Sequence, residues 1–485
     1  MMELTQRPQG VGIARVPPHE CRAACAPSIA RQNPLGDGIM ESIGAFLVAG
    51  LYLAALPVEL FVGTRVPFPF IAYTIAVSCL VLFVRWRRLE EGLLAAFGRS
   101  NRTAAAFLLL IAALVFWFAL EMFVSPCPNY ARRKYALWLV NGLLPLIVGY
   151  LWLDKPERID TLLRAGLIWV TLVLVFWLAS PNAVCSLDTR HVVLRGEFSE
   201  LTSCSFCREV SLAAMACVVS VGLRVFVGPA LLIPALLAPA MLYLALQSGS
   251  RGAVLSFAVS VFFFVAFSLD RRKLLLFGVG VALAAAAAFT HIAATNSVTG
   301  ILDSGLLQGD VQDGSVLEHF AAWRLSASTA VRQPLGVGLG GYAHIAQYGD
   351  EPLYPHNVLL EAWVESGWVG LGLYACLVAM PFICLGRRLF ADKRLVAISS
   401  LFAVTFLFAM TYLGIEGNNP YWFFLGGLWA AAASSRTSVA APCPRRNATV
   451  MELPRTLAGA QPARTQRRLL PAEGSGMRRT PQAIR

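Results

Sequence analysis

Long runs of apolar residues alternate with short polar segments along most of this 485-residue chain. A transmembrane helix needs about 20 mostly apolar residues to cross the hydrocarbon core of a bilayer. The runs are continuous and rich in Leu, Ala, Val and Phe, without the two-residue alternation of membrane barrels, so they predict helices. Twelve spans are expected, at 43–62, 67–84, 103–124, 135–153, 161–180, 209–227, 229–247, 252–269, 273–293, 366–385, 396–413 and 420–435.

The composition changes this picture little. Hydrophobic residues make up 57% of the chain and charged residues only 14%, whereas an ordinary soluble domain carries about 25% charged residues. The predicted fold class is therefore all-α, a polytopic membrane helix bundle of about 12 transmembrane helices surrounded by membrane lipids.

The two ends of the chain differ from the rest. Residues 1–42 contain four arginines but no compact apolar core, so they predict a basic, disordered tail rather than a cleaved signal peptide. Residues 436–485 are rich in Arg, Pro, Ala, Gly and Ser and predict a second disordered tail. Residues 43–435 are expected to form the transmembrane domain.

The positive charges predict the orientation, because Lys and Arg gather on the cytoplasmic side of membrane proteins. With the N-terminus inside, 30 of the 40 Lys and Arg residues fall on the cytoplasmic side of the twelve spans. Both termini are therefore expected in the cytoplasm. The tails and the helix ends beside anionic lipid also account for the net charge of +12, so no nucleic-acid partner is expected.

Two loops on the predicted outer side are long, at 181–208 and at 294–365, the second between the ninth and tenth spans. The first contains Cys185, Cys204 and Cys207. Outside the membrane cysteines tend to pair, so these three and Cys127 are expected to form disulfides or to stay as free thiols, and the sequence does not give the pairing. A single CxxC lacks the second half of a four-ligand zinc site, so no metal is expected there.

The second loop contains a cluster of glycines in the sequence PLGVGLGGY, with Gly336, Gly338 and Gly340 at alternate positions. The GxGxxG pattern that it contains needs a preceding strand to indicate a dinucleotide site, and none is expected here. Glycines allow close approach of the backbone, so the loop is predicted to present amide N–H groups to a phosphate or a sugar. The alternative is a simple connection between two helices.

His356 and Asn357 precede VLLEAWVES, which has the composition of a helix. Asn357 is the expected N-cap. The positive end of the helix dipole would then oppose protonation of His356, and a general base needs a neutral imidazole. Glu361 lies one turn into the helix, where it is expected to orient the imidazole or to pair with an arginine, and a capping or solvated position is the alternative. A structural, hydrogen-bonding role for His356 is the alternative.

Three arginines on the predicted outer side run against the positive-inside bias and indicate an anionic partner. Arg251 opens the eighth span, and Arg324 and Arg332 lie in the amphipathic segment 316–332. Guanidinium groups bind phosphate oxygens through paired hydrogen bonds, so these residues predict a diphosphate clamp. Interaction of Arg251 with lipid headgroups is the alternative. His319 has no companion pattern and is expected to be structural.

Together these motifs resemble a known family. The order SGSRGA, WR, PLGVGLGGY and PHNVLLEAWVESGWVGL is similar to the O-antigen ligase and polymerase superfamily of bacterial inner-membrane glycosyltransferases, over about residues 210–430 and most strongly over 320–372. The resemblance implies a GT-C-like helical fold with a large periplasmic loop between late helices. It also implies transfer of a glycan from undecaprenyl diphosphate to an acceptor hydroxyl, with inversion and without a metal or other cofactor.

By position, the resemblance implies that Arg251 and Arg324 bind the diphosphate and that His356 activates the acceptor. The acidic residues of the outer loops are scattered, which also favours a metal-free mechanism. Ligation to lipid A core is the first expectation, because of where the large loop lies. Polymerisation onto a growing glycan and transfer to protein are alternatives. A transporter or flippase is the alternative of another class, although no internal repeat is seen.

Overall fold

The structure is a computed structural model that describes residues 34–52, 69–86, 90, 101–178, 184–186, 191–194, 197–247, 250–268, 314–412 and 414–437. The predicted span 273–293 and almost all of both predicted tails lie outside these residues. The first helix, α1 (Pro34–Tyr52), begins before the predicted first span, so residues 34–42 are helical rather than part of a disordered tail. Pro34 suits the first position of a helix, where a backbone N–H has no partner inside the helix.

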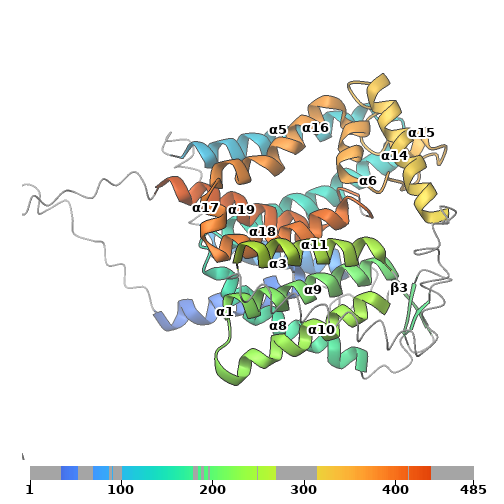
Figure 1. The fold of residues 1–485 in the computed structure, drawn as a ribbon. Helices are drawn as coiled ribbons and strands as arrows, with labels where there is room; N and C mark the ends of the chain where they lie inside the picture. The colour runs from blue at the N-terminus through green and yellow to red at the C-terminus, as the bar shows by residue number, and fades with distance from the viewer. Residues whose placement is uncertain are drawn as a thin grey trace, which may run out of the picture. The chain divides into compact units, whose positions relative to one another are not determined.

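Helices occupy every predicted span that the structure describes (Figure 1). The fourth span is composite, because a π-helical turn at Leu139–Leu143 joins α6 (Pro128–Trp138) to α7 (Leu144–Trp152). The other spans contain α1, α3 (Pro69–Val84), α5 (Arg102–Val124), α8 (Arg158–Leu178), α9 (Ser203–Leu223), α10 (Leu232–Gln247), α11 (Arg251–Ser268), α16 (Val358–Leu385), α18 (Lys393–Ala409) and α19 (Asn419–Thr437).

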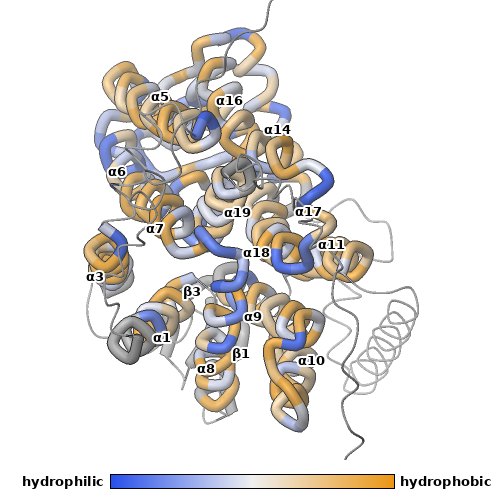
Figure 2. The backbone as a smooth tube through the Cα atoms, turned by 90° about the vertical axis from the view of Figure 1, so that its left-hand side faces the viewer, coloured by the Kyte–Doolittle hydropathy of each residue, from blue (hydrophilic) through white to orange (hydrophobic). Residues whose placement is uncertain are grey.

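Within the described residues, five helical stretches are long and apolar enough to cross a membrane. Figure 2 shows hydrophobic residues over most of the length of α5 and α10, two of these stretches. The prediction of a helical membrane protein is confirmed. The number of twelve spans stays a prediction, because the span 273–293 is not described. The five stretches are Arg102–Val124, Pro128–Trp152, Phe206–Leu223, Gly228–Leu246 and Val358–Leu385.

The predicted outer loop 181–208 contains a small antiparallel sheet that the sequence analysis missed. Its strands are β1 (Val184–Ser186), β2 (His191–Leu194) and β3 (Glu197–Thr202), in the order β1-β2-β3, and β3 leads directly into α9. The β-branched pair Val192–Val193 is typical of a strand. A single sheet of this size does not change the fold class, since the remaining described elements are helical.

Two of the four cysteines are free thiols, the second of the two predicted alternatives. Cys127 and Cys207 carry thiols, and both side chains are buried. The Cys127 thiol donates to the carbonyl oxygen of Gly349 at 3.1 Å, and the Cys207 thiol donates to that of Ala245 at 3.3 Å. The side chains of Cys185 and Cys204 lie outside the described residues, so their pairing is still open.

The segments predicted to be cytoplasmic lie together. Arg158, which follows the fourth span, binds Glu41 before the first span at 3.0 Å. Arg394, at the start of α18, binds Asp160 at 2.8 Å. These ion pairs connect the predicted cytoplasmic ends of the first, fourth, fifth and eleventh spans. Spans that cross the membrane alternately require these ends to lie on the same side.

The segments predicted to be extracytoplasmic also lie together. Asp350, from the second long loop, accepts hydrogen bonds from the backbone N–H groups of Tyr130 at 2.8 Å and Asn129 at 3.1 Å, and so caps α6. The Tyr130 hydrogen bond is the main cause of the lowered pKa of Asp350. Which of the two ends faces the periplasm remains a prediction.

Helix α16 leads away from this second end and positions the candidate site. It packs against α5, α19 and α14 (Gly314–Arg332), and Figure 1 shows α5 and α16 running side by side. Gly367 interrupts it with a φ of 62°, so the helix kinks about two and a half turns after its start. The residues before this kink carry the polar groups described next.

Candidate active site

His356 lies immediately before α16, as predicted. Asn357 is the N-cap, and its side-chain oxygen accepts the N–H groups of Leu359 and Leu360, each at 3.1 Å. The N-cap prediction is therefore confirmed. The backbone of His356 has a φ of 55°, a left-handed conformation that is uncommon outside glycine and for which His, Asn and Asp are enriched.

One ring nitrogen of His356 has a fixed partner. Its Nδ1 lies 3.0 Å from the carbonyl oxygen of Tyr412, in the segment that follows α18. A carbonyl oxygen only accepts hydrogen bonds, so the geometry assigns the proton to Nδ1. In the neutral imidazole the lone pair then lies on Nε2, which is the arrangement that a general base needs.

Aromatic rings surround the imidazole of His356. The rings of His319, on α14, and Tyr354 lie 4.7 Å and 4.9 Å away between centroids. Burial raises the pKa of Tyr354 above its ordinary value, so its phenol stays protonated. His319 was predicted to be structural, but it is a neighbour of the candidate base. No spacing in the sequence links these two histidines, because α14 and α16 meet only in the folded chain.

The predicted arginines are only partly placed. Arg251 is the first residue of α11, and its side chain lies outside the described residues. The helix start is near the site, because a Cβ on Gly252 would lie 2.7 Å from Oγ1 of Thr411, next to Tyr412. Arg324 is an exposed residue of α14, five positions after His319.

Arg332, at the end of α14, is exposed as well. Within the described parts of the chain, neither Arg324 nor Arg332 forms an ion pair. Both guanidinium groups therefore have hydrogen-bond donors left for an anionic ligand. The structure does not bring them into contact with His356, so their predicted role in binding diphosphate stays a prediction.

Glu361 has a different partner from the one predicted. Its Oε1 lies 2.5 Å from Nζ of Lys134, a fully buried lysine of α6, and not against an arginine or the imidazole. Glu365, one turn further along α16, binds the same Nζ with both oxygens, at 2.8 Å and 2.7 Å. Both glutamates are 1% exposed. Lys134 is thus a component of the site region that the sequence analysis missed.

The glycine loop packs against the kink of α16. The N–H groups of Val337 and Gly338 donate to the carbonyl oxygens of Val364 and Glu365, each at 3.0 Å. In the opposite direction, the N–H of Trp368 donates to the carbonyl of Pro334 at 2.9 Å. The loop and the kinked helix therefore hold each other through backbone hydrogen bonds.

This packing contradicts the prediction that the loop presents free amide N–H groups to a ligand, because those groups have partners within the protein. The N–H of Gly336 donates to the carbonyl of Gln333 at 2.9 Å, and that of Gly338 is taken by α16. The Gly340 N–H bonds the Glu365 carboxylate. Gly336, Gly338 and Gly340 all have positive φ angles, so glycine is needed at these positions for the turn itself. In this conformation their amides are not presented to a phosphate or a sugar.

Replacing Gly367 with Ala is expected to destabilise the protein. A Cβ at this position would overlap the carbonyl oxygen of Pro334, and its φ of 62° costs an L-residue about 1–2 kcal/mol before any clash. Gly372→Ala in the same helix is the control, because no atom lies within 4 Å of a Cβ there. Thermal unfolding in detergent should show a lower Tm for Gly367→Ala alone, and equal Tm values would contradict the packing.

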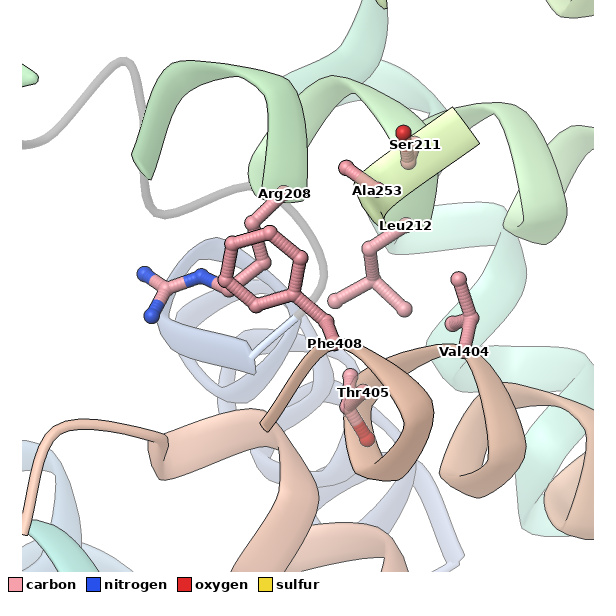
Figure 3. Close-up of a pocket in the computed structure, with 7 residues that line it drawn as sticks. All are labelled: Arg208, Ser211, Leu212, Ala253, Val404, Thr405 and Phe408. Carbon is pink, nitrogen blue, oxygen red and sulfur yellow. The ribbon is translucent and has the colours of Figure 1, made fainter. Parts of the chain in front are cut away.

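A narrow crevice lies beside the site, between α9, α11 and α18. Figure 3 shows Leu212, Val404 and Phe408 along this crevice, with the guanidinium of Arg208 directed away from Ser211. The crevice has no room for a water molecule. His356 does not line this crevice.

Residues 236–375 match the model of the family described as O-antigen ligase. This part of the chain is O-antigen ligase-like. The resemblance to O-antigen ligase seen in the sequence motifs is thus confirmed for this segment. The ligase-like segment includes Arg251, Arg324 and His356, whereas Lys134 and Tyr412 lie beyond its limits. A search of curated proteins finds no match to the chain.

Proposed function

We propose that this chain transfers a glycan from an undecaprenyl-diphosphate carrier to an acceptor hydroxyl on the periplasmic side of the bacterial inner membrane. The observation that carries the proposal is the contact of 3.0 Å between Nδ1 of His356 and the Tyr412 carbonyl. It leaves Nε2 with the lone pair that an acceptor hydroxyl requires. The match to O-antigen ligase supports this reaction class.

In the proposed reaction, Nε2 of His356 takes the proton of the acceptor hydroxyl as its oxygen attacks the anomeric carbon. The bond between that carbon and the diphosphate oxygen breaks, and the electron pair leaves with the lipid diphosphate. A single displacement of this kind inverts the anomeric configuration. Arg251 and Arg324 neutralise the negative charge on the leaving group, so the mechanism uses no metal.

Replacing Arg324 with Ala is expected to weaken use of the lipid-linked donor. A hydrogen bond to a charged group contributes about 1.5–3 kcal/mol, which corresponds to a loss of roughly 10- to 100-fold in kcat/KM. Arg387→Ala is the matched control, since Arg387 is an exposed arginine beyond the far end of α16. Transfer rates at varied donor concentration measure the effect. An equal loss in both variants would show that general charge, rather than a diphosphate site, is responsible.

The acceptor defines two versions of this function. In the favoured version it is lipid A core, which makes the chain a ligase of lipopolysaccharide biosynthesis. In the other it is a growing glycan, which makes the chain a repeat-unit polymerase. A flippase would move the carrier-linked glycan without breaking its bond to diphosphate.

The surface polysaccharide of a strain that lacks this chain separates these versions. Short lipid A core without polymer, together with accumulated carrier-linked polymer, is the result expected for a ligase. Single repeats on the core indicate a polymerase. Accumulation of single carrier-linked repeats on the cytoplasmic face would instead indicate a flippase and contradict the proposal.

A further inference from the structure

We infer that Glu361 is a positioning residue for His356 and that Lys134 is its counter-ion. Glu361 acts through the described backbone of residues 411–412 and 414–417, called segment 411–417 below. The inference rests on the proposed function, because it concerns how the proposed base is held. It assigns a mechanistic role to the buried charges, none of which touches the imidazole.

The orientation of His356 depends on segment 411–417. The Tyr412 carbonyl is the group that bonds Nδ1, so the position of this carbonyl fixes both the tautomer and the direction of Nε2. A shift of the segment would turn or release the ring. A misplacement of about 1 Å at a reacting group can cost roughly 100-fold in rate.

Side chains of three helices in turn hold segment 411–417 in place. Glu361 Oε2 accepts the backbone N–H of Ile415 at 3.0 Å, and the indole N–H of Trp422 donates to the Ile415 carbonyl at 3.0 Å. The guanidinium of Arg208 donates to the carbonyl of Gly417 at 3.1 Å. Side chains from α9, α16 and α19 therefore hold the backbone of Ile415 and Gly417, three and five positions after Tyr412.

The two contacts of the Glu361 side chain explain why this position has a carboxylate. Each carboxylate oxygen of Glu361 has a different partner: Oε1 contacts Nζ of Lys134, and Oε2 accepts the Ile415 N–H. A buried ion pair loses hydration energy, and well-packed apolar residues often join helices at least as stably. An apolar side chain could not accept the Ile415 N–H, whereas the carboxylate can, and Lys134 compensates its charge.

Glu365 provides the internal comparison. It lies on the same helix, is equally buried and binds the same lysine. Its carboxylate hydrogen bonds go to Lys134 and to the glycine loop. Within the described residues, no hydrogen bond joins Glu365 to segment 411–417, so Glu365 shares the electrostatic environment of Glu361 but not its proposed positioning role.

The test compares Glu361→Gln with Glu365→Gln in proteoliposomes. The probe is the carrier-linked glycan that accumulates in the strain lacking this chain, with that strain's lipid A core as acceptor. An amide has a single oxygen, so Glu361→Gln must place its NH₂ group against Lys134 or against the Ile415 N–H. Lys134 and Glu365 still balance one another, which favours folding. We expect kcat to fall roughly 10- to 100-fold with the KM for donor unchanged.

Glu365→Gln is expected to keep kcat within about twofold of the wild-type value, because segment 411–417 keeps its contacts. A second variant, Trp422→Phe, removes the other bond to Ile415 without touching the ionic cluster, and should also lower kcat but not raise KM. The inference is overturned if Glu361→Gln and Trp422→Phe keep the wild-type kcat, or if both glutamine variants lose kcat equally.

His356→Asn, measured beside these variants, separates the inference from the proposed function. If this variant loses transfer while Glu361→Gln and Trp422→Phe keep it, the proposed function stands and the positioning role is wrong. If His356→Asn transfers glycan at the wild-type rate, the proposed function itself is wrong.

Discussion

Replacing His356 with Asn is expected to abolish glycan transfer while the protein accumulates normally in the membrane. Asn tolerates the left-handed φ of 55° that His356 adopts, so the start of α16 should keep its conformation. Its amide N–H can also replace Nδ1–H as donor to the Tyr412 carbonyl. What the variant lacks is the lone pair on Nε2, and loss of a general base lowers rates by about 10²- to 10⁴-fold.

The measurement is restoration of surface polysaccharide in a strain that lacks the chain, with immunoblotting to check the amount of protein. His344→Asn is the matched control, because His344 is an exposed histidine on the short helix α15 (Tyr342–Ile345). It should restore polysaccharide fully. Restoration by His356→Asn to the wild-type level would show that the histidine is structural.

Replacing Lys134 with Met is expected to cause the largest loss of stability of any single substitution considered. Lys134 is fully buried, and both Glu361 and Glu365 depend on it for charge compensation. Met fills a similar volume but leaves two buried carboxyl groups side by side. Removal of one partner from a buried ion pair typically costs about 3–5 kcal/mol.

Thermal unfolding of the detergent-solubilised protein measures this loss as a lower Tm. A triple variant provides the control, in which Lys134→Met is combined with Glu361→Gln and Glu365→Gln. Because it removes both carboxylates together with the lysine, it should recover much of the stability without recovering transfer. A Tm for Lys134→Met equal to that of the wild type would mean that the three side chains are not a buried ionic cluster.

The positions of the helices could be predicted because each depends on a continuous apolar run that is visible locally. The same holds for Asn357, since an N-cap is determined by the residues next to it. The match of residues 236–375 to the O-antigen ligase family agrees with the resemblance that the short motifs indicated. In all of these cases the information lies within a few tens of residues.

The partner of Glu361 could not be predicted, because it lies far away in the sequence. The sequence analysis did not single out Lys134, because nothing in its local sequence distinguishes it from the neighbouring Arg132 and Arg133. The contact of His319 with His356 has the same origin, as it depends on how α14 packs against α16. Contacts between distant helices follow from packing, which periodicity along one helix does not reveal.

The glycine loop shows a different limit. Its positive φ angles agree with the expectation that glycine is needed for close approach of the backbone. The sequence does not reveal what approaches, and the structure shows α16 where a phosphate or sugar was expected. The three strands between Val184 and Thr202 are only three to six residues long, too short for a clear alternation of apolar and polar positions.

The most direct test of the central claim uses purified protein in liposomes that contain the undecaprenyl-diphosphate-linked glycan and the acceptor. Acceptor-linked glycan and released undecaprenyl diphosphate are quantified together by mass spectrometry. The proposed function predicts one released diphosphate for each glycan joined with the wild-type chain, and neither product with His356→Asn. A carrier-linked glycan that stays intact but crosses the bilayer would contradict it and identify the chain as a transporter.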